Sequence, residues 1–253
     1  MKIIYKLALA LLLAMPAVVN AGGIGLYVPI SFGDTMDVTL SPDSGYTGAS
    51  DVNQVTEYKA ATGLGLMFDS NLGKDKLFNY RLGLEWMDRT VDTVSYDGGS
   101  ARSCTGDSSD LFRFQMIHTF GFGVLRTEMF RLWIGPRINL GWNYRNDEGT
   151  YGKQSEFNYE IGIAPVVGLN VNIGRWFAVA ADLDYRFAGV GGAYVYSPNT
   201  GSDRTNTYSG SDNGATMRLY AIFKFGEDFR PDSQYEDEEP QQSLDSSDES
   251  ANY

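Results

Sequence analysis

The chain has 253 residues and a formal net charge of −12, with one cysteine and one histidine. These counts exclude an intrachain disulfide and a metal site built from several histidines. Residues 1–21 contribute +2 and residues 226–253 contribute −9, which leaves −5 for residues 22–225. A mildly acidic body argues against nucleic-acid binding, which needs a basic surface.

The first residues have the order of a secretory signal peptide. Two lysines precede an apolar run from Leu7 to Met15, and small residues follow up to Ala21. The run is shorter than the roughly 20 residues that a membrane-spanning helix needs. We expect residues 1–21 to be a signal peptide that is removed. No later stretch reaches about 18 apolar residues, so any membrane-embedded form must be a β-barrel.

Alternation of apolar with small or polar residues dominates from Gly22 to Gly226 and repeats eight times. A period of two is typical of β-strands. Each run has about 9–13 residues, the length that a tilted strand needs to cross hydrocarbon. The runs are, in chain order, 24–32, 58–68, 80–87, 112–122, 132–144, 157–171, 177–187 and 217–225. They predict an all-β fold: a transmembrane, eight-stranded, antiparallel up-and-down β-barrel over residues 22–225.

The connections between these runs alternate in length. Long connections follow every odd run, at Gly33 to Val55, Val91 to Asp110, Arg145 to Glu156 and Ala188 to Asn213. Short connections follow the second, fourth and sixth runs, at Ser70–Leu77, Arg126–Phe130 and Asn172–Arg175. Outer-membrane barrels have long extracellular connections and short periplasmic turns. We therefore expect the long connections outside the cell and both termini in the periplasm.

The apolar face of each run is expected to meet lipid. A soluble barrel of the lipocalin type would turn that face inward, but eight strands leave room for few bulky side chains and the apolar face would overfill the lumen. An arginine at mid-bilayer would cost about 2–4 kcal/mol, whereas a paired charge in the lumen is tolerable. The expected lumen charge network comprises Lys59, Arg81, Glu85, Arg113, Arg137, Glu160, Asp182, Asp184, Arg186, Arg218 and Lys224.

Aromatic residues concentrate near both ends of the runs, as expected of girdles at the two membrane surfaces. The side of the long connections has Phe32, Tyr58, Trp86, Phe112, Trp142, Tyr144, Phe157, Tyr185 and Phe187. The side of the short turns has Phe68, Tyr80, Phe120, Phe122, Phe177, Phe223 and Phe225. Pro29, Pro136 and Pro165 lie inside runs and each removes a ladder donor, so irregularities are expected there.

On these features the chain resembles the small outer-membrane proteins of the OmpA/OmpX type, within the outer-membrane β-barrel superfamily. The resemblance covers residues 22–225 and includes the final run, which ends in Phe223-Lys224-Phe225. It implies the outer membrane of a Gram-negative bacterium, with membrane lipid and the barrel-assembly machinery as partners. It also implies that Phe223 and Phe225 form the assembly signal, although here 28 residues follow Phe225.

Residues 226–253 form a separate acidic segment. They contain ten acidic residues, one basic residue and almost no aliphatic ones. Such a segment cannot bury enough apolar surface to offset its ordering entropy. We expect a disordered periplasmic tail, for which docking to a periplasmic partner is one possible role.

The sequence favours a non-enzymatic anchor without a cofactor, which supports the envelope or presents its connections to ligands or surfaces. A narrow channel ranks second because eight strands leave little room for solutes, and an accessory subunit docked through the tail ranks third. Enzymatic barrels of similar type use a histidine with a serine or an acid near the outer rim, but His118 lies mid-run with no serine beside it. Cys104 is expected to be an unpaired thiol.

Two connections have distinctive compositions. Asp34 and three further aspartates in the first connection are expected to be solvated, with cation attraction as the alternative. Tyr194, Tyr196 and the serines and asparagines around them resemble antibody contact loops in composition. An ordinary polar surface is the favoured interpretation of this fourth connection.

Overall fold

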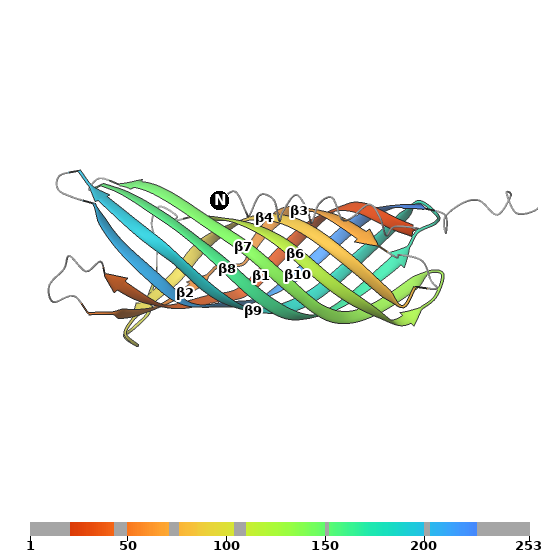
Figure 1. Cartoon of the computed structure of the whole chain (residues 1–253), viewed down its shortest axis with the longest axis horizontal. Coiled ribbons are helices and arrows are strands. Elements are labelled where there is room, and N and C mark those ends of the chain that lie inside the picture. The colour runs from red at the N-terminus through yellow and green to blue at the C-terminus, as the bar shows by residue number, and fades with distance from the viewer. Residues whose placement is uncertain are drawn as a thin grey trace, which may run out of the picture.

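The computed structural model describes residues 21–42, 50–70, 76–103, 110–149, 152–199 and 203–226. Most of the expected signal peptide, Cys104 and the acidic tail beyond Gly226 lie outside these residues. The described residues form one elongated barrel of tilted strands (Figure 1). They include no helix that is long and apolar enough to span a bilayer.

Ten strands make up the described part of the chain, and all their pairings are antiparallel. Eight of them close a ring in the order β1-β3-β4-β6-β7-β8-β9-β10, and β10 returns to β1. The prediction of an eight-stranded antiparallel barrel is therefore confirmed. The strand bounds are β1 Ala21–Pro42, β2 Val52–Tyr58, β3 Ala61–Ser70, β4 Phe78–Tyr96, β5 Arg102–Ser103, β6 Asp110–Arg126, β7 Phe130–Gly149, β8 Gly152–Asn172, β9 Phe177–Pro198 and β10 Arg204–Gly226.

The two faces of the barrel wall differ as the alternation predicts. Outward positions carry exposed apolar side chains along a broad band, such as Ile24, Leu66 and Ile163, which is 66% exposed. Inward positions carry glycine, alanine and buried polar groups, such as Arg81 and Arg137. Bulky apolar side chains therefore form the outer band, while small, ionic and some aromatic side chains such as Trp133 fill the lumen.

The strands are longer than the sequence runs and take up part of each predicted long connection, most of all the third and the fourth. β1 continues to Pro42, and the β7–β8 hairpin pairs as far as Gly149 opposite Gly152. β9 and β10 pair up to Tyr196 opposite Arg204. Since a strand rises about 3.3 Å per residue and a barrel strand is tilted by about 40°, roughly ten extra residues extend the wall by about 25 Å beyond the apolar band.

Three neighbouring strands change the facing of their side chains at about the same level. In β1 a bulge lies between Phe32 and Thr35, and Gly33 has a φ of 66°. The second barrel strand is interrupted between Tyr58, the end of β2, and Ala61, the start of β3. β4 has a bulge opposite Glu57 and Tyr58. Each irregularity moves the following residues to the opposite face, because side chains alternate with a period of two.

The three prolines lie at the expected irregularities. The β1–β3 pairing has a gap between Tyr27 and Ile30, on either side of Pro29. Pro136 and Pro165 are paired with each other across β7 and β8. The ladders on the far sides of those two strands, β6–β7 and β8–β9, each skip two positions there. The backbone N–H donors that the prolines lack are thus confined to short gaps in the strand pairing.

Candidate functional site

The lower part of the lumen holds a buried ion network at the level of the lipid-facing band. Arg81 pairs with Asp69 at 2.6 Å, and Arg137 pairs with Asp182 at 2.6 Å. Asp184 contacts Arg137 and Arg218, and Arg218 pairs with Glu85 at 2.7 Å. We call this set the lower network; its members are Asp69, Arg81, Glu85, Arg137, Asp182, Asp184 and Arg218. All are at most 4% exposed, so bulk water does not reach them.

Aromatic rings complete the lower network. The Tyr220 hydroxyl donates to Asp182 at 2.6 Å, and the guanidinium of Arg81 lies 4.5 Å from the Tyr220 ring centroid. The ring of Trp133, which is fully buried, lies on the same guanidinium at 5.2 Å. A buried charge is stable only when it is paired and hydrogen-bonded. The ion pairs and hydrogen bonds of the lower network meet both of these requirements.

A second ion network lies higher in the lumen, toward the extended wall. Arg89 pairs with Asp212 at 2.7 Å and with Asp34 at 3.4 Å. Arg186 bonds to Asp212 at 3.0 Å, and Arg113 pairs with Glu160. We call this set the upper network; its members are Asp34, Arg89, Arg113, Glu160, Arg186 and Asp212. Equal numbers of arginines and carboxylates make it neutral.

Most of the charges expected in the lumen lie in these networks, but Lys59 does not. Lys59 is exposed at the break between β2 and β3, because the interruption turns it outward and Tyr58 inward. The prediction that Lys59 lies inside and Tyr58 in a lipid-facing girdle is therefore wrong. Lys224 is buried near the short turns, where it donates to the Gly174 carbonyl at 2.8 Å, away from both networks.

Sequence reasoning missed four members of the networks. Asp34 follows the bulge in β1, which the alternation does not predict, and Arg89 keeps the inward parity of β4 beyond the end of the predicted run. Asp212 lies in a stretch taken for a connection. Asp69 follows the inward parity of its run, so continuing that alternation by one residue would have found it. Asp34 is 1% exposed, which overturns the expectation of a solvated loop residue.

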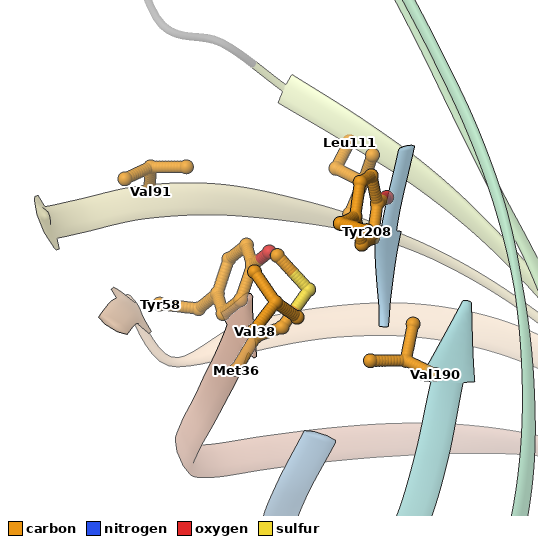
Figure 2. Packing of buried hydrophobic residues seen from close by; sticks show 7 residues of the cluster. All are labelled: Met36, Val38, Tyr58, Val91, Leu111, Val190 and Tyr208. Carbon is orange, nitrogen blue, oxygen red and sulfur yellow. The ribbon is translucent and has the colours of Figure 1, made fainter. Parts of the chain in front are cut away.

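Above the upper network the lumen widens into a cavity of about 440 Å³, which we call the cup. Its floor is a buried apolar cluster that includes Met36, Val38, Tyr58 and Tyr208 (Figure 2). The Tyr58 hydroxyl lies 3.8 Å from the Met36 sulfur. The guanidinium of Arg89 lies 3.7 Å from the Tyr58 ring centroid, so the cup floor rests directly on the upper network.

The cup has an apolar wall and a polar wall. The apolar wall comes mainly from the three strands with irregularities, through Met36, Val38, Leu40, Tyr58, Val91 and Val94. The polar wall comes from the regular strands opposite, through Arg145, Gln154, Glu156, Tyr194 and Asn206. The cup is therefore amphipathic in cross-section.

A hydrogen-bonded group anchors the polar wall. Arg145 pairs with Glu156 at 3.0 Å, and the Tyr208 hydroxyl donates to the same carboxylate at 2.5 Å. The Asn158 amide donates to the Tyr208 oxygen at 2.7 Å. Burial, reinforced by the Glu156 charge, raises the pKa of Tyr208, so its hydroxyl keeps its proton. Glu156 thus already has three partners, since Asn158 also donates to it at 3.4 Å.

The tyrosines of the fourth predicted connection belong to this region. Tyr194 lies on β9 between the cup and a neighbouring outer pocket of about 400 Å³. Tyr196 and Arg204 line the outer pocket, and Gln154 and Asn206 are shared by both. Tyr194 and Tyr196 therefore line pockets on paired strands, and the interpretation as an ordinary polar surface loop is not supported.

His118 lies in the outer wall, where one of its ring nitrogens has a tyrosine partner. The Tyr80 hydroxyl lies 2.7 Å from its Nδ1 atom. The Phe120 ring packs against the Tyr80 ring on one side and against the Phe78 ring on the other. The pair explains how an imidazole can occupy the apolar band.

Two aromatic bands flank the apolar band. Near the short turns, Phe223 packs against Phe177 at 5.6 Å and Phe225 against Phe68 at 6.5 Å between ring centroids. On the other side, the Phe114 ring lies between Trp86 and Trp142. No cluster of three or more histidine, cysteine or acidic side chains within the described ranges has the arrangement of a metal site.

The chain was compared with known families, curated proteins and solved structures. No family model matches the sequence, and no curated protein matches it. The outer membrane protein OprG from Pseudomonas aeruginosa has a TM-score of 0.60 at 13% identity, over 83% of this chain and 97% of that one. The attachment invasion locus protein Ail of Yersinia pestis has a TM-score of 0.38 at 15% identity, over 81% of this chain and 99% of that one. Neisserial surface protein A has a TM-score of 0.33 at 14% identity, over 77% and 96%. The likeness to OprG shows that the chain has the fold of an outer-membrane β-barrel protein.

Proposed function

We propose that the chain is a non-enzymatic integral protein of the outer membrane of a Gram-negative bacterium. In this proposal a closed barrel anchors the extended wall and its connections above the bilayer. The exposed apolar band, with aromatic residues on both sides, supports membrane insertion, since charged lipid-facing residues would be costly.

One observation carries the proposal of an anchor: two stacked ion networks fill the lumen. Their six arginines and seven carboxylates come from all eight ring strands and are 0–4% exposed. Removing one member would leave an unpaired buried charge, so the networks favour a fixed, closed interior.

Planar-bilayer recording tests the closed lumen. The folded protein should show no steady open conductance, because solute passage would require several buried ion pairs to separate together. A variant altered in both networks, with Arg137→Ala and Arg218→Ala below and Arg89→Ala and Arg186→Ala above, serves as the comparison. It removes two large side chains from each network and should allow current. A steady conductance of the unaltered protein would contradict the proposal and favour a narrow channel.

We also propose that the extended wall lies outside the cell and that both termini lie in the periplasm. Ala21 and Gly226 are paired at the same end of the barrel as the short turns, which supports a common side for both. In a Cys104→Ser background, a membrane-impermeant maleimide should label Thr39→Cys on intact cells and spare Arg175→Cys. The reverse labelling would invert the orientation.

Two roles near the C-terminus remain proposals. Phe223 and Phe225 form the outward aromatic end of β10, where the barrel-assembly machinery would read them. Replacing both with alanine should lower the amount of folded barrel in the membrane. If the tail docks a periplasmic partner, deleting residues 227–253 should remove that partner from the purified protein while the barrel still folds.

A further inference from the structure

The cup has the properties of a small-molecule site that the anchor role does not use. Its volume of about 440 Å³ falls in the ordinary range of ligand pockets, about 300–1,000 Å³. Most of its lining residues are on strands and not on connections, so the site is largely preformed. It stands above the lipid-facing band, and the upper network closes it from below.

The apolar wall results from a specific change in the strand pattern. Before Gly33 the even-numbered residues of β1 face outward, whereas after the bulge Met36, Val38 and Leu40 face the lumen. The outward positions after the bulge are Thr35, Asp37 and Thr39, which suit water. The irregularities lie in β1, between β2 and β3, and in β4. In the upper part of the barrel they therefore help to turn apolar side chains toward the lumen, where no lipid requires them on the outer face.

The charges of the lining favour an acidic ligand over a basic one. Glu156 already accepts from Tyr208 and Asn158 and pairs with Arg145. Arg145 faces the cup, and Arg204 lines the adjoining outer pocket. A guanidinium carries five N–H donors, so Arg145 can pair with Glu156 and also with a second carboxylate that enters beside it.

We propose that the cup binds a small carboxylate whose apolar body is a short alkyl chain or a single aromatic ring. The body lies against Met36, Val38 and Val91, and the carboxylate faces Arg145 on the polar wall. The upper network forms a floor, so the ligand enters and leaves by the open end of the barrel. This inference goes beyond the anchor role and does not depend on the result of the conductance measurement.

Methyl NMR of the full-length mature protein in lipid nanodiscs, with 13C-methyl methionine, tests the proposal. Sodium hexanoate is the probe. It should shift the Met36 signal in a saturable manner and leave the Met67 signal unchanged, because Met67 packs in the separate cluster with Tyr27 and Tyr220. Hexylamine should produce no saturable shift, and 1-hexanol should bind more weakly than hexanoate. Met36→Leu assigns the signal.

Two variants separate the walls of the site. Val38→Trp fills the cup and should abolish the response to hexanoate, whereas Thr39→Trp, one residue along and on the outer face, should leave it unchanged. Arg145→Gln should weaken hexanoate binding roughly tenfold, the cost of one charge-assisted bond, and leave 1-hexanol unaffected. Arg175→Gln, at the opposite end of the barrel, is its matched control.

Three results would overturn the inference. The first is a Met36 shift that rises without saturation or that Met67 shares, because it would indicate partition into the bilayer. The second is equal binding of hexylamine, which would remove the role of the arginine. The third is unchanged binding in Arg145→Gln, an outcome that stays informative even if Val38→Trp fails to fold.

Discussion

At the level of the lipid-facing band the lumen is packed with paired arginines and carboxylates, whereas above Gly33 methionine, valine and tyrosine line it. The outer surface changes in the opposite sense, from exposed leucine and isoleucine to threonine, serine and aspartate. Both changes follow from the same cause. In the proposed placement, lipid surrounds the lower wall, so apolar residues face outward there. Water surrounds the upper wall, where irregularities in three strands help to turn apolar residues inward.

One strand pattern thus builds two different interiors. β8 and β10 keep one parity along most of their length, and they supply Glu160 and Arg218 below and Glu156 and Tyr208 above. Among the irregular strands, β1 supplies its part of the apolar wall after its bulge, whereas β4 supplies Val91 before its bulge and Val94 after it. Ion pairs therefore fix the membrane-level segment, and the cup depends on local backbone geometry. Variants in each region should separate these two dependences.

The largest effect is expected in the lower network. Arg137→Met leaves Asp182 and Asp184 with fewer cations, and breaking a buried pair of this kind costs about 3–5 kcal/mol. The free energy of unfolding in lipid vesicles, followed in urea by tryptophan fluorescence and gel mobility, measures it. Arg102→Met on the exposed β5 is the control and should change stability by less than about 0.5 kcal/mol. Similar small losses for both would show that the networks do not fix the lower segment.

A charge placed on the outer wall should distinguish the two levels directly. Ile163→Arg lies in the apolar band and should cost about 2–4 kcal/mol, because lipid does not solvate the guanidinium. Thr39→Arg lies outward on the extended wall and should change stability by less than about 0.5 kcal/mol. The same unfolding assay compares them, and equal effects would place the bilayer elsewhere on the barrel.

A smaller effect is expected where β1 changes its facing. Gly33 has a φ of 66° with open space around its Cα, so Gly33→Ala adds backbone strain without a clash and should cost about 1–2 kcal/mol. Gly189→Ala also meets open space but has no left-handed backbone, so its stability should not fall. If Gly33→Ala is as stable as Gly189→Ala, the bulge does not depend on glycine. Hexanoate titration of the same variant would then report whether the cup survives.

The smallest effect concerns the pair in the outer wall. Tyr80→Phe removes the hydroxyl that contacts His118 and should cost about 1 kcal/mol, the net value of one hydrogen bond. Tyr185→Phe, whose ring packs against Phe187 at 4.9 Å, is the matched control and should be nearly neutral. If Tyr185→Phe lost as much stability as Tyr80→Phe, the loss would come from removing any tyrosine hydroxyl of the outer wall and not from the contact with His118.

The regular part of the barrel could be predicted from sequence because lipid imposes a strict period of two. Apart from Tyr58, the runs contributed their expected outward faces, and arginines such as Arg81 and Arg218 fell on inward positions. Lys59 and Tyr58 were misplaced because the break after β2 inserts residues without a strong signal in composition. Gly33 was a visible signal for a bulge, but a glycine next to polar residues also suits the start of a loop.

The cup could not be predicted from the sequence for a related reason. Its lining comes from seven strand segments, and their shared level depends on register, which the alternation alone does not specify. Once β1 and β10 are paired so that Met36 lies opposite Asp212, the remaining positions follow. The polar stretch 204–213 reads as a loop in isolation and becomes a strand because β1 and β9 lie on either side of it.

The seam between β1 and β10 bears on how the barrel must form. It runs from Ala21 opposite Gly226 to Pro42 opposite Asn206, so the earliest strand in the chain is hydrogen-bonded to the latest along its full length. Until the last strand arrives, the growing sheet has two long unpaired edges, which are templates for pairing with other chains. Closure also brings together segments about 200 residues apart in sequence, and contacts of such separation slow folding. Both edges therefore stay open together until closure, and release of the unclosed sheet should end in aggregation.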